Sequence, residues 1–155
     1  MCFTIRKAVL SDLGPALALD REVFGVDAWT IMDYAGAFSD RGVKKFTAEA
    51  DGKFAGFAAS DLEGNSGNVC LLTLAVVPQY QRRGIGSALL GAIESAFGDR
   101  ASFLYVDAAN ETAIRLYRRA GYVQKGVIPA YYMNGHDALI FHKGKKSDRT
   151  RERPD

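Results

Sequence analysis

The sequence predicts an α/β domain, and three observations support that fold class. Short apolar runs typical of strands alternate with segments that have the apolar spacing of helices. The dipeptide Asp51-Gly52, which suits a tight hairpin turn, separates two of the strand-like runs. Another run, Val69–Val77, is followed at once by Pro78 and then by a helix-like segment. With 155 residues, of which 48% are hydrophobic, the chain has enough apolar material for one core, so we expect a single domain.

The first half of the chain predicts a strand, a helix, a second short helix and a hairpin, in that order. Ser11 and Asp12 offer a cap for the first helix. The apolar residues of that helix follow helical spacing and are Leu13, Leu17, Ala18 and Val23. The other elements are expected over residues 3–8 (strand), 25–42 (irregular, with the short helix), and 45–49 and 53–60 (hairpin).

The second half predicts further strands and helices around Val69–Val77. This run is too short for a typical buried helix and is rich in Val and Leu, so we expect a central strand there. The remaining elements are expected over residues 87–97 and 110–119 (helices), and 102–107, 122–127 and 137–142 (strands). Residues 143–155 are polar and lack apolar periodicity, so we expect the domain to end at residue 142 and this tail to be disordered.

Charge and composition limit the possible functions. The chain carries a net charge of +2, and its tail holds six basic and three acidic residues, so residues 1–142 carry −1. A nearly neutral body argues against a nucleic-acid module, which needs a basic face. The longest apolar run is too short to span a membrane, and the start lacks the order of a secretory signal, so we expect a soluble, cytoplasmic protein. Cys2 and Cys70 suggest neither a disulfide framework nor a metal cluster.

A site for a polyanion is predicted where the central strand meets the next helix. Gly84 and Gly86 allow close backbone approach, and the first amides of the helix form an anion site. Arg82 and Arg83 add positive charge suited to a diphosphate. Neither a P-loop nor a dinucleotide fingerprint fits, because no Gly-Lys-Ser/Thr ending is present and Leu89 stands where a third glycine would be needed.

Three segments resemble one family. Residues 74–90, LAVVPQYQRRGIGSALL, closely resemble the coenzyme A motif of the GNAT acetyltransferases, Gln/Arg-x-x-Gly-x-Gly/Ala. Residues 110–122, NETAIRLYRRAGY, resemble the family's Asn-x-x-Ala-x-x-Leu-Tyr-x-x-x-Gly-Phe/Tyr segment at the family's spacing. Residues 131–138, YYMNGHDA, are similar to a stretch of protein N-alpha-acetyltransferases, including the bacterial ribosomal-protein-alanine type. The resemblance covers residues 3–142 and is weaker in the first half.

This resemblance implies the GNAT fold, with a mixed, mostly antiparallel sheet that splays near Val76 and has helices on both faces. It also implies that an amine attacks the thioester of acetyl-CoA directly in a ternary complex, without a covalent enzyme intermediate. The implied coenzyme-binding residues are Leu74, Ala75, Val76, Arg82, Arg83, Gly84, Ile85, Gly86, Ser87 and Asn110. Among these, the Val76 amide would donate to the thioester oxygen.

Tyr117 matches the family tyrosine that donates a proton to the coenzyme A thiolate; the alternative is a tyrosine packed in the core. The general base departs from the family pattern, because Tyr105 stands where ribosomal-protein-type relatives have a glutamate. Tyrosine is a poor base at neutral pH, since its ordinary pKa is about 10, so we expect Tyr105 to orient a water that removes the proton. Asp107 is a possible substitute base, although a helix cap or loop role is the simpler expectation.

Acceptor-binding residues are expected in two places. Glu22 and Asp27 lie near the end of the first helix, where relatives build one wall of the peptide cleft. Tyr131 and Tyr132 suit the hydrogen-bonding wall that grips a peptide backbone, or are half-buried aromatic residues at a strand edge. We expect His136, in a turn-like stretch, to be a surface residue.

The sequence therefore predicts an acetyl-CoA-dependent N-acetyltransferase that acts on a primary amine, with a protein N-terminus as the leading acceptor. Two alternatives remain open, a small-molecule acceptor such as a polyamine or aminoglycoside, and a non-catalytic sensor of acyl-CoA. We expect no metal and no nucleic-acid partner. The oligomeric state does not follow from the sequence.

Overall fold

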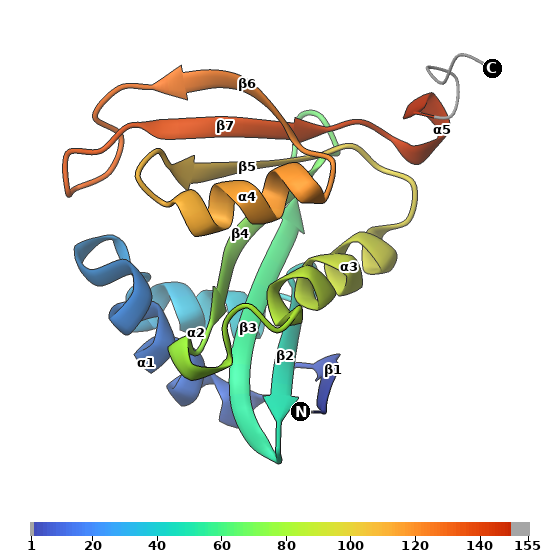
Figure 1. Ribbon diagram of the computed structural model, residues 1–155. Coiled ribbons are helices and arrows are strands. Elements are labelled where there is room, and N and C mark those ends of the chain that lie inside the picture. The colour runs from blue at the N-terminus through green and yellow to red at the C-terminus, as the bar shows by residue number, and fades with distance from the viewer. Residues whose placement is uncertain (1, 150–155) are drawn as a thin grey trace. The chain divides into compact units, whose positions relative to one another are not determined.

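The computed structural model describes residues 2–149 of the chain (Figure 1). In chain order, its elements are β1 (Phe3–Lys7), η1 (Leu10–Asp12), α1 (Leu13–Phe24), η2 (Gly25–Asp27), α2 (Ile31–Ser39), β2 (Lys44–Ala50), β3 (Lys53–Leu62), β4 (Val69–Val76), η3 (Pro78–Tyr80), α3 (Ile85–Phe97), β5 (Ser102–Asp107), α4 (Glu111–Arg119), β6 (Val123–Ile128), β7 (Ala138–Lys143) and α5 (Lys146–Arg149). The predicted order of strands and helices is confirmed, with boundaries that shift by a few residues. Within the described part of the chain, no helix is long and apolar enough to cross a membrane.

The strands form one mixed sheet in the order β1-β2-β3-β4-β5-β7-β6. The pairs β1/β2, β2/β3, β5/β7 and β6/β7 are antiparallel. β4 and β5 pair in parallel through Val69 with Ser102 and Cys70 with Phe103, at the start of both strands. The mixed, mostly antiparallel sheet expected from the family resemblance is therefore confirmed, whereas the splay near Val76 stays a prediction.

The chain divides into two compact units. Of the described residues, the first unit comprises 2–61 and 72–96, and the second comprises 62–71 and 97–149. The first unit contains α1, α2 and most of α3, together with β1 to β3 and the end of β4. The second unit contains α4, α5, and the strands β5 to β7.

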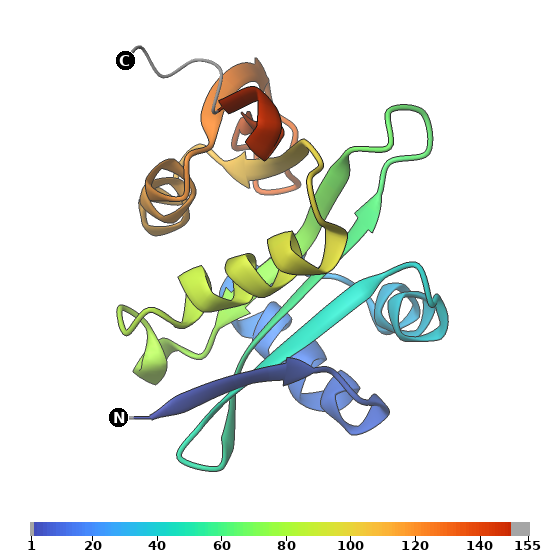
Figure 2. The same ribbon diagram turned by 90° about the vertical axis from the view of Figure 1, so that its right-hand side faces the viewer.

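In the first unit, helices cover both faces of the sheet because successive residues of β3 point to opposite sides. Phe57 belongs to a buried cluster with residues of α1 and α2, and its ring lies 5.8 Å from that of Tyr34. Gly56 points the other way, since a Cβ built there would meet a side-chain methyl of Leu89 on α3 at 3.2 Å. Figure 2 shows α1 and α2 on one side of β2 and β3 and α3 on the other.

In the second unit, α4 packs against the strands through aromatic side chains. The rings of Tyr117 and Tyr122 lie 5.9 Å apart, edge to face. The buried hydroxyl of Tyr122 is hydrogen-bonded to that of Ser102 on β5 at 2.8 Å. The Arg118 guanidinium lies over the ring of Phe141 on β7, 5.9 Å from its centroid. These contacts join the helix to the β5-β7 part of the sheet.

Two expectations need correction. The strand expected to end at residue 142 continues to Lys143, and α5 follows because the Asp99 carboxylate accepts a hydrogen bond from the Lys146 amide at 2.6 Å. The remainder of the predicted tail, residues 150–155, lies outside the described residues. In α1, the expected apolar face was only partly right, since Ala18 is exposed and Asp20 is buried.

Candidate active site

The predicted site residues fall into two sets, one in each unit. The first unit holds Glu22, the Leu74–Val76 segment and the 82–87 loop. The second unit holds Tyr105, Asn110, Tyr117, Tyr131 and Tyr132. Each set has its own geometry.

The predicted anion site lies in the first unit, at the start of α3. The chain turns there through two left-handed conformations, Arg82 with φ of 62° and Gly84 with φ of 85°. Contrary to the expected start at Ser87, the helix begins at Ile85, and the Ala88 amide donates to the Gly84 carbonyl at 3.0 Å. Because that bond is the first of the helix, the amides of residues 85–87 have no intrahelical acceptor.

The surroundings of these amides fit a pyrophosphate. Arg82, Arg83 and Gly84 are exposed, so a ligand can reach the helix end from solvent. Ile85 is 1% exposed and anchors the first turn in the core. Positive side chains beside the positive end of a helix dipole attract a polyanion. The residues present therefore suit the diphosphate of coenzyme A.

β4 precedes this turn in the chain, and its last residues are the ones predicted to contact the coenzyme. Ala75 is buried, while Leu74 and Val76 are half-buried on the opposite face of the strand. Gln81 donates from its side-chain amide to the Val76 carbonyl at 3.1 Å and so ties the strand end to the loop. β3 approaches closely here, since a Cβ at Gly56 would lie 2.9 Å from the Ala75 carbonyl oxygen.

A buried polar group in the first unit was missed by the sequence reasoning. The Asp20 carboxylate accepts hydrogen bonds from the Trp29 amide at 2.6 Å and from the Thr73 hydroxyl at 3.1 Å. Its burial raises the pKa of Asp20, and these two hydrogen bonds oppose that shift. Glu22, the predicted acceptor ligand two residues later, is exposed on α1. An acidic residue within a helix carries no signal of burial, because burial depends on the neighbouring elements.

In the second unit, Tyr117 lies on the buried face of α4 and is 6% exposed. Burial raises the pKa of Tyr117, so its hydroxyl remains protonated at neutral pH. Asn110 caps the same helix, since its side-chain oxygen accepts from the Ala113 amide at 3.2 Å. The helix therefore begins at Glu111 rather than at Asn110 as expected.

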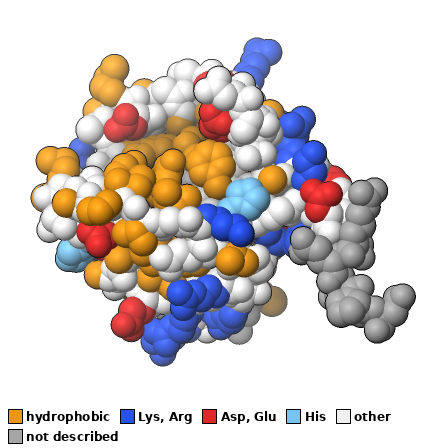
Figure 3. Space-filling model, turned by 90° about the horizontal axis from the view of Figure 1, so that it is seen from above, with side chains coloured by type: hydrophobic (Ala, Val, Ile, Leu, Met, Phe, Trp, Pro, Cys, Tyr) orange, Lys and Arg blue, Asp and Glu red, His pale blue; other side chains and the backbone are white. Residues whose placement is uncertain are grey.

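Three of the predicted tyrosines lie together. Tyr105 is 42% exposed, and its ring centroid lies 5.7 Å from that of Tyr131. Tyr131 in turn meets Tyr132 at 5.0 Å, edge to face. After burial, the neighbouring Tyr122 and Tyr132 contribute to the raised pKa of Tyr117. Figure 3 shows the face seen from above: hydrophobic side chains gather over one part of it, and Lys and Arg side chains lie over other parts.

Asp107 and His136 form a pair that the sequence reasoning did not predict. The His136 Nδ1 atom lies 3.0 and 2.9 Å from the two Asp107 carboxylate oxygens. Asp107 pairs with Ala138 across β5 and β7, so residue 136 falls just outside the strand and beside the carboxylate. His136 is exposed, as expected, but it is hydrogen-bonded. The strand register brings together two residues that lie 29 positions apart.

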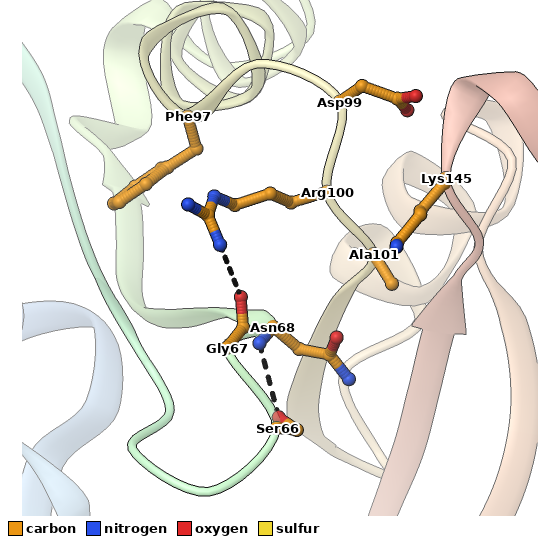
Figure 4. A pocket seen from close by; sticks show the side chains of 8 residues that line it. All are labelled: Ser66, Gly67, Asn68, Phe97, Asp99, Arg100, Ala101 and Lys145. Atoms are coloured by element: carbon orange, nitrogen blue, oxygen red, sulfur yellow. Dashed lines mark hydrogen bonds between the residues drawn. The ribbon is translucent and has the colours of Figure 1, made fainter.

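A separate pocket of about 320 Å³ lies in the second unit (Figure 4). The Arg100 guanidinium reaches across it to donate to the Gly67 carbonyl at 3.2 Å. Its lining residues are Ser66, Gly67, Asn68, Phe97, Asp99, Arg100, Ala101 and Lys145. It contains none of the residues predicted from the sequence to bind coenzyme or acceptor.

Comparison with known proteins gives one family and several similar proteins. Residues 14–122 match the model of the acetyltransferase (GNAT) family. An N-alpha-acetyltransferase of Sulfurisphaera tokodaii is 29% identical over 160 aligned residues, which cover 89% of this chain and 90% of that protein.

Two solved structures are similar in fold along most of their length. The ribosomal-protein-S18-alanine N-acetyltransferase from Escherichia coli superposes with a TM-score of 0.80 and 27% identity, covering 93% of this chain and 94% of that one. Arabidopsis thaliana NAA60 in complex with acetyl-CoA has a TM-score of 0.80 at 21% identity, covering 94% and 99%. At that lower identity the likeness concerns the fold alone.

Proposed function

The chain belongs to the GNAT acetyltransferase family, and we propose that the amine it acetylates is the N-terminal α-amine of a protein. As an N-acetyltransferase of this family, it uses acetyl-CoA, which supplies the acetyl group as a thioester. The proposal concerns the acceptor and the roles of individual residues. Similarity to a protein named as an N-alpha-acetyltransferase and to a ribosomal-protein-S18-alanine N-acetyltransferase supports it.

The coenzyme residues follow from the family motif and from the anion site. The Arg82 and Arg83 side chains and the amides at the start of α3 would hold the pyrophosphate. Leu74, Ala75 and Asn110 would pair with the pantetheine arm. The Val76 amide would donate a hydrogen bond to the thioester oxygen as negative charge develops there. The residues assigned to the pyrophosphate are Arg82, Arg83, Gly84, Ile85, Gly86 and Ser87.

The remaining roles concern protons and the acceptor. Tyr117 would protonate the sulfur that leaves, a role that requires a hydroxyl near the sulfur. Tyr105 would orient a water molecule beside the amine. Glu22, Tyr131 and Tyr132 would bind the acceptor. We propose that the amine attacks directly, in a ternary complex.

The observation that carries the peptide assignment is the contact series from Tyr105 through Tyr131 to Tyr132. Tyrosine offers an apolar ring and a hydroxyl, which suits a peptide with its side chains and backbone amides. A polyamine would need several available carboxylates. Asp107, on the same face of β5, already accepts from Ala109 and Asn134 and pairs with His136.

The test is release of free thiol from acetyl-CoA with a panel of peptides that differ in their first residues. Polyamines and aminoglycosides form the second arm, and the same peptides with a blocked N-terminus are the matched control. We expect turnover with a subset of free peptides and none with the blocked ones. Turnover only on small amines would reassign the acceptor, and acetyl-CoA binding without any turnover would remove the catalytic assignment.

A further inference from the structure

The acceptor amine must lose a proton before it attacks, and the expected family glutamate is absent. An N-terminal α-amine has a pKa of about 7.7–8.0, so most of it is protonated at pH 7. Tyr105 occupies the glutamate position, and a phenol is protonated at that pH. A water oriented by Tyr105 still needs a group that finally accepts the proton.

We propose that His136, held by Asp107, is the general base that accepts the proton of the acceptor amine. This inference rests on the proposed acetylation of an amine and names the group that the family pattern leaves open. It does not depend on whether the amine belongs to a peptide.

The geometry leaves one imidazole nitrogen available for the proton. Nδ1 of His136 lies within 3.0 Å of both carboxylate oxygens of Asp107, so it carries the hydrogen and donates to them. The lone pair is then on Nε2. A carboxylate that fixes the tautomer of a histidine also stabilises the imidazolium that forms when Nε2 is protonated.

Asp107 is built to orient the histidine rather than to act as the base itself. Its burial favours the neutral form, but hydrogen bonds from the Ala109 amide at 2.9 Å and the Asn134 side chain at 3.0 Å, together with His136, outweigh that effect and lower the pKa of Asp107. The carboxylate therefore stays ionised and has its oxygens engaged.

The loop that carries His136 also carries the proposed acceptor ligands. The Tyr132 amide donates to the His136 carbonyl at 3.2 Å, and the Gly135 amide donates to the Tyr132 carbonyl at 2.9 Å. Other titratable groups of this loop are Tyr131, Tyr132 and Asp137, and Asp137 accepts from the Ala130 amide. The His136 side chain is 49% exposed, so it can pass the proton on to solvent.

The step conserves atoms and charge. An N–H bond of the ammonium breaks, its electron pair stays on nitrogen, and the proton goes to Nε2, directly or through one water. The nitrogen lone pair then forms the bond to the acetyl carbon while the carbon–sulfur electrons leave with sulfur. Tyr117 gives its proton to the departing sulfur, and the second amine proton, lost from nitrogen after the attack, returns through solvent to the Tyr117 phenolate. The imidazolium releases the first proton to solvent, so one proton is released in each turnover.

The experiment compares His136→Gln and Asp107→Asn with the matched control His142→Gln, which makes the same change at the other histidine of the chain. The value of kcat/KM is measured from pH 7 to pH 9 with whichever amine the wild type accepts. We expect His136→Gln to lower it about 100-fold at pH 7, a typical contribution of general base catalysis. The deficit should narrow once the pH exceeds the pKa of the amine used, because the amine then loses its proton without help. For an N-terminal α-amine this happens by pH 9, whereas an alkylamine, with a pKa of about 10.4, requires measurement up to about pH 11.

If His136 had only a structural role, the loss of kcat/KM in His136→Gln would be the same at every pH. That result would overturn the proposal. It would also be overturned if His136→Gln stayed within about twofold of the wild type at pH 7. Should His136→Gln fail to fold, Asp107→Asn supplies the same pH test, because it removes the charge that holds the tautomer. Failure of the wild type with peptides would concern the acceptor proposal, and the base would then be tested with the small amine.

Discussion

Replacing Gly56 by alanine should disturb the strand assigned to the pantetheine arm. The added Cβ would lie 2.9 Å from the Ala75 carbonyl oxygen and 3.2 Å from Leu89. An ordinary contact starts at 3.4 Å, so the backbone of β4 must move to relieve the overlap. Overpacking of this kind costs about 1–3 kcal/mol. For a chain of this length, a loss of about 2 kcal/mol corresponds to a fall in Tm of about 4–8 °C.

The assay is thermal unfolding with and without acetyl-CoA, followed by the KM for acetyl-CoA. We expect a lower Tm and a higher KM, because Ala75 and Val76 are proposed to pair with the coenzyme. Gly91→Ala is the matched control, since nothing lies within 4 Å of a Cβ at that position on α3. It should leave Tm unchanged or raise it. A Gly56→Ala protein with the Tm and KM of the wild type would refute the steric argument.

Three further predictions concern other residues. Tyr117→Phe should lower kcat by about 100-fold without raising the KM for acetyl-CoA. The control Tyr122→Phe should cost about 1 kcal/mol of stability and leave kcat unchanged. If the two variants had the same kcat, Tyr117 would not be the acid. Arg82→Ala and Arg83→Ala should each raise the KM for acetyl-CoA, with a smaller effect at high salt, and a KM insensitive to both would argue against the anion site. Asp12→Asn should lower the free energy of unfolding by about 1–2 kcal/mol at pH 7. The hydrogen bond from Arg6 holds the pKa of Asp12 below its ordinary value of 3.8, so this stabilisation exists above that pH and is lost on acidification. Denaturant unfolding should therefore show a smaller difference in the free energy of unfolding between the wild type and Asp12→Asn at pH 3 than at pH 7.

The family and the loop predicted to bind an anion could be recognised in the sequence because both depend on local features. The turn at Arg82 and Gly84 and the free amides after it arise within a few consecutive residues. A strand over Val69–Val77 was predicted from length and composition, and the structure has it at Val69–Val76. The roles of the individual residues in catalysis remain proposals, since they rest on the family motif.

Other features depended on contacts between distant segments. The burial of Asp20 arises from its bonds to Trp29 and Thr73, which no spacing within α1 predicts. The pairing of Asp107 with His136 arises from the register of β5 and β7.

The sequence by itself therefore determined the family, through its motifs, and the order of the elements, because hydrophobic periodicity and turn chemistry act over short distances along the chain. Only the tertiary structure decided which polar side chains are buried and which histidine is held by a carboxylate. Those properties depend on strand register and helix packing, which bring together residues that no local pattern connects.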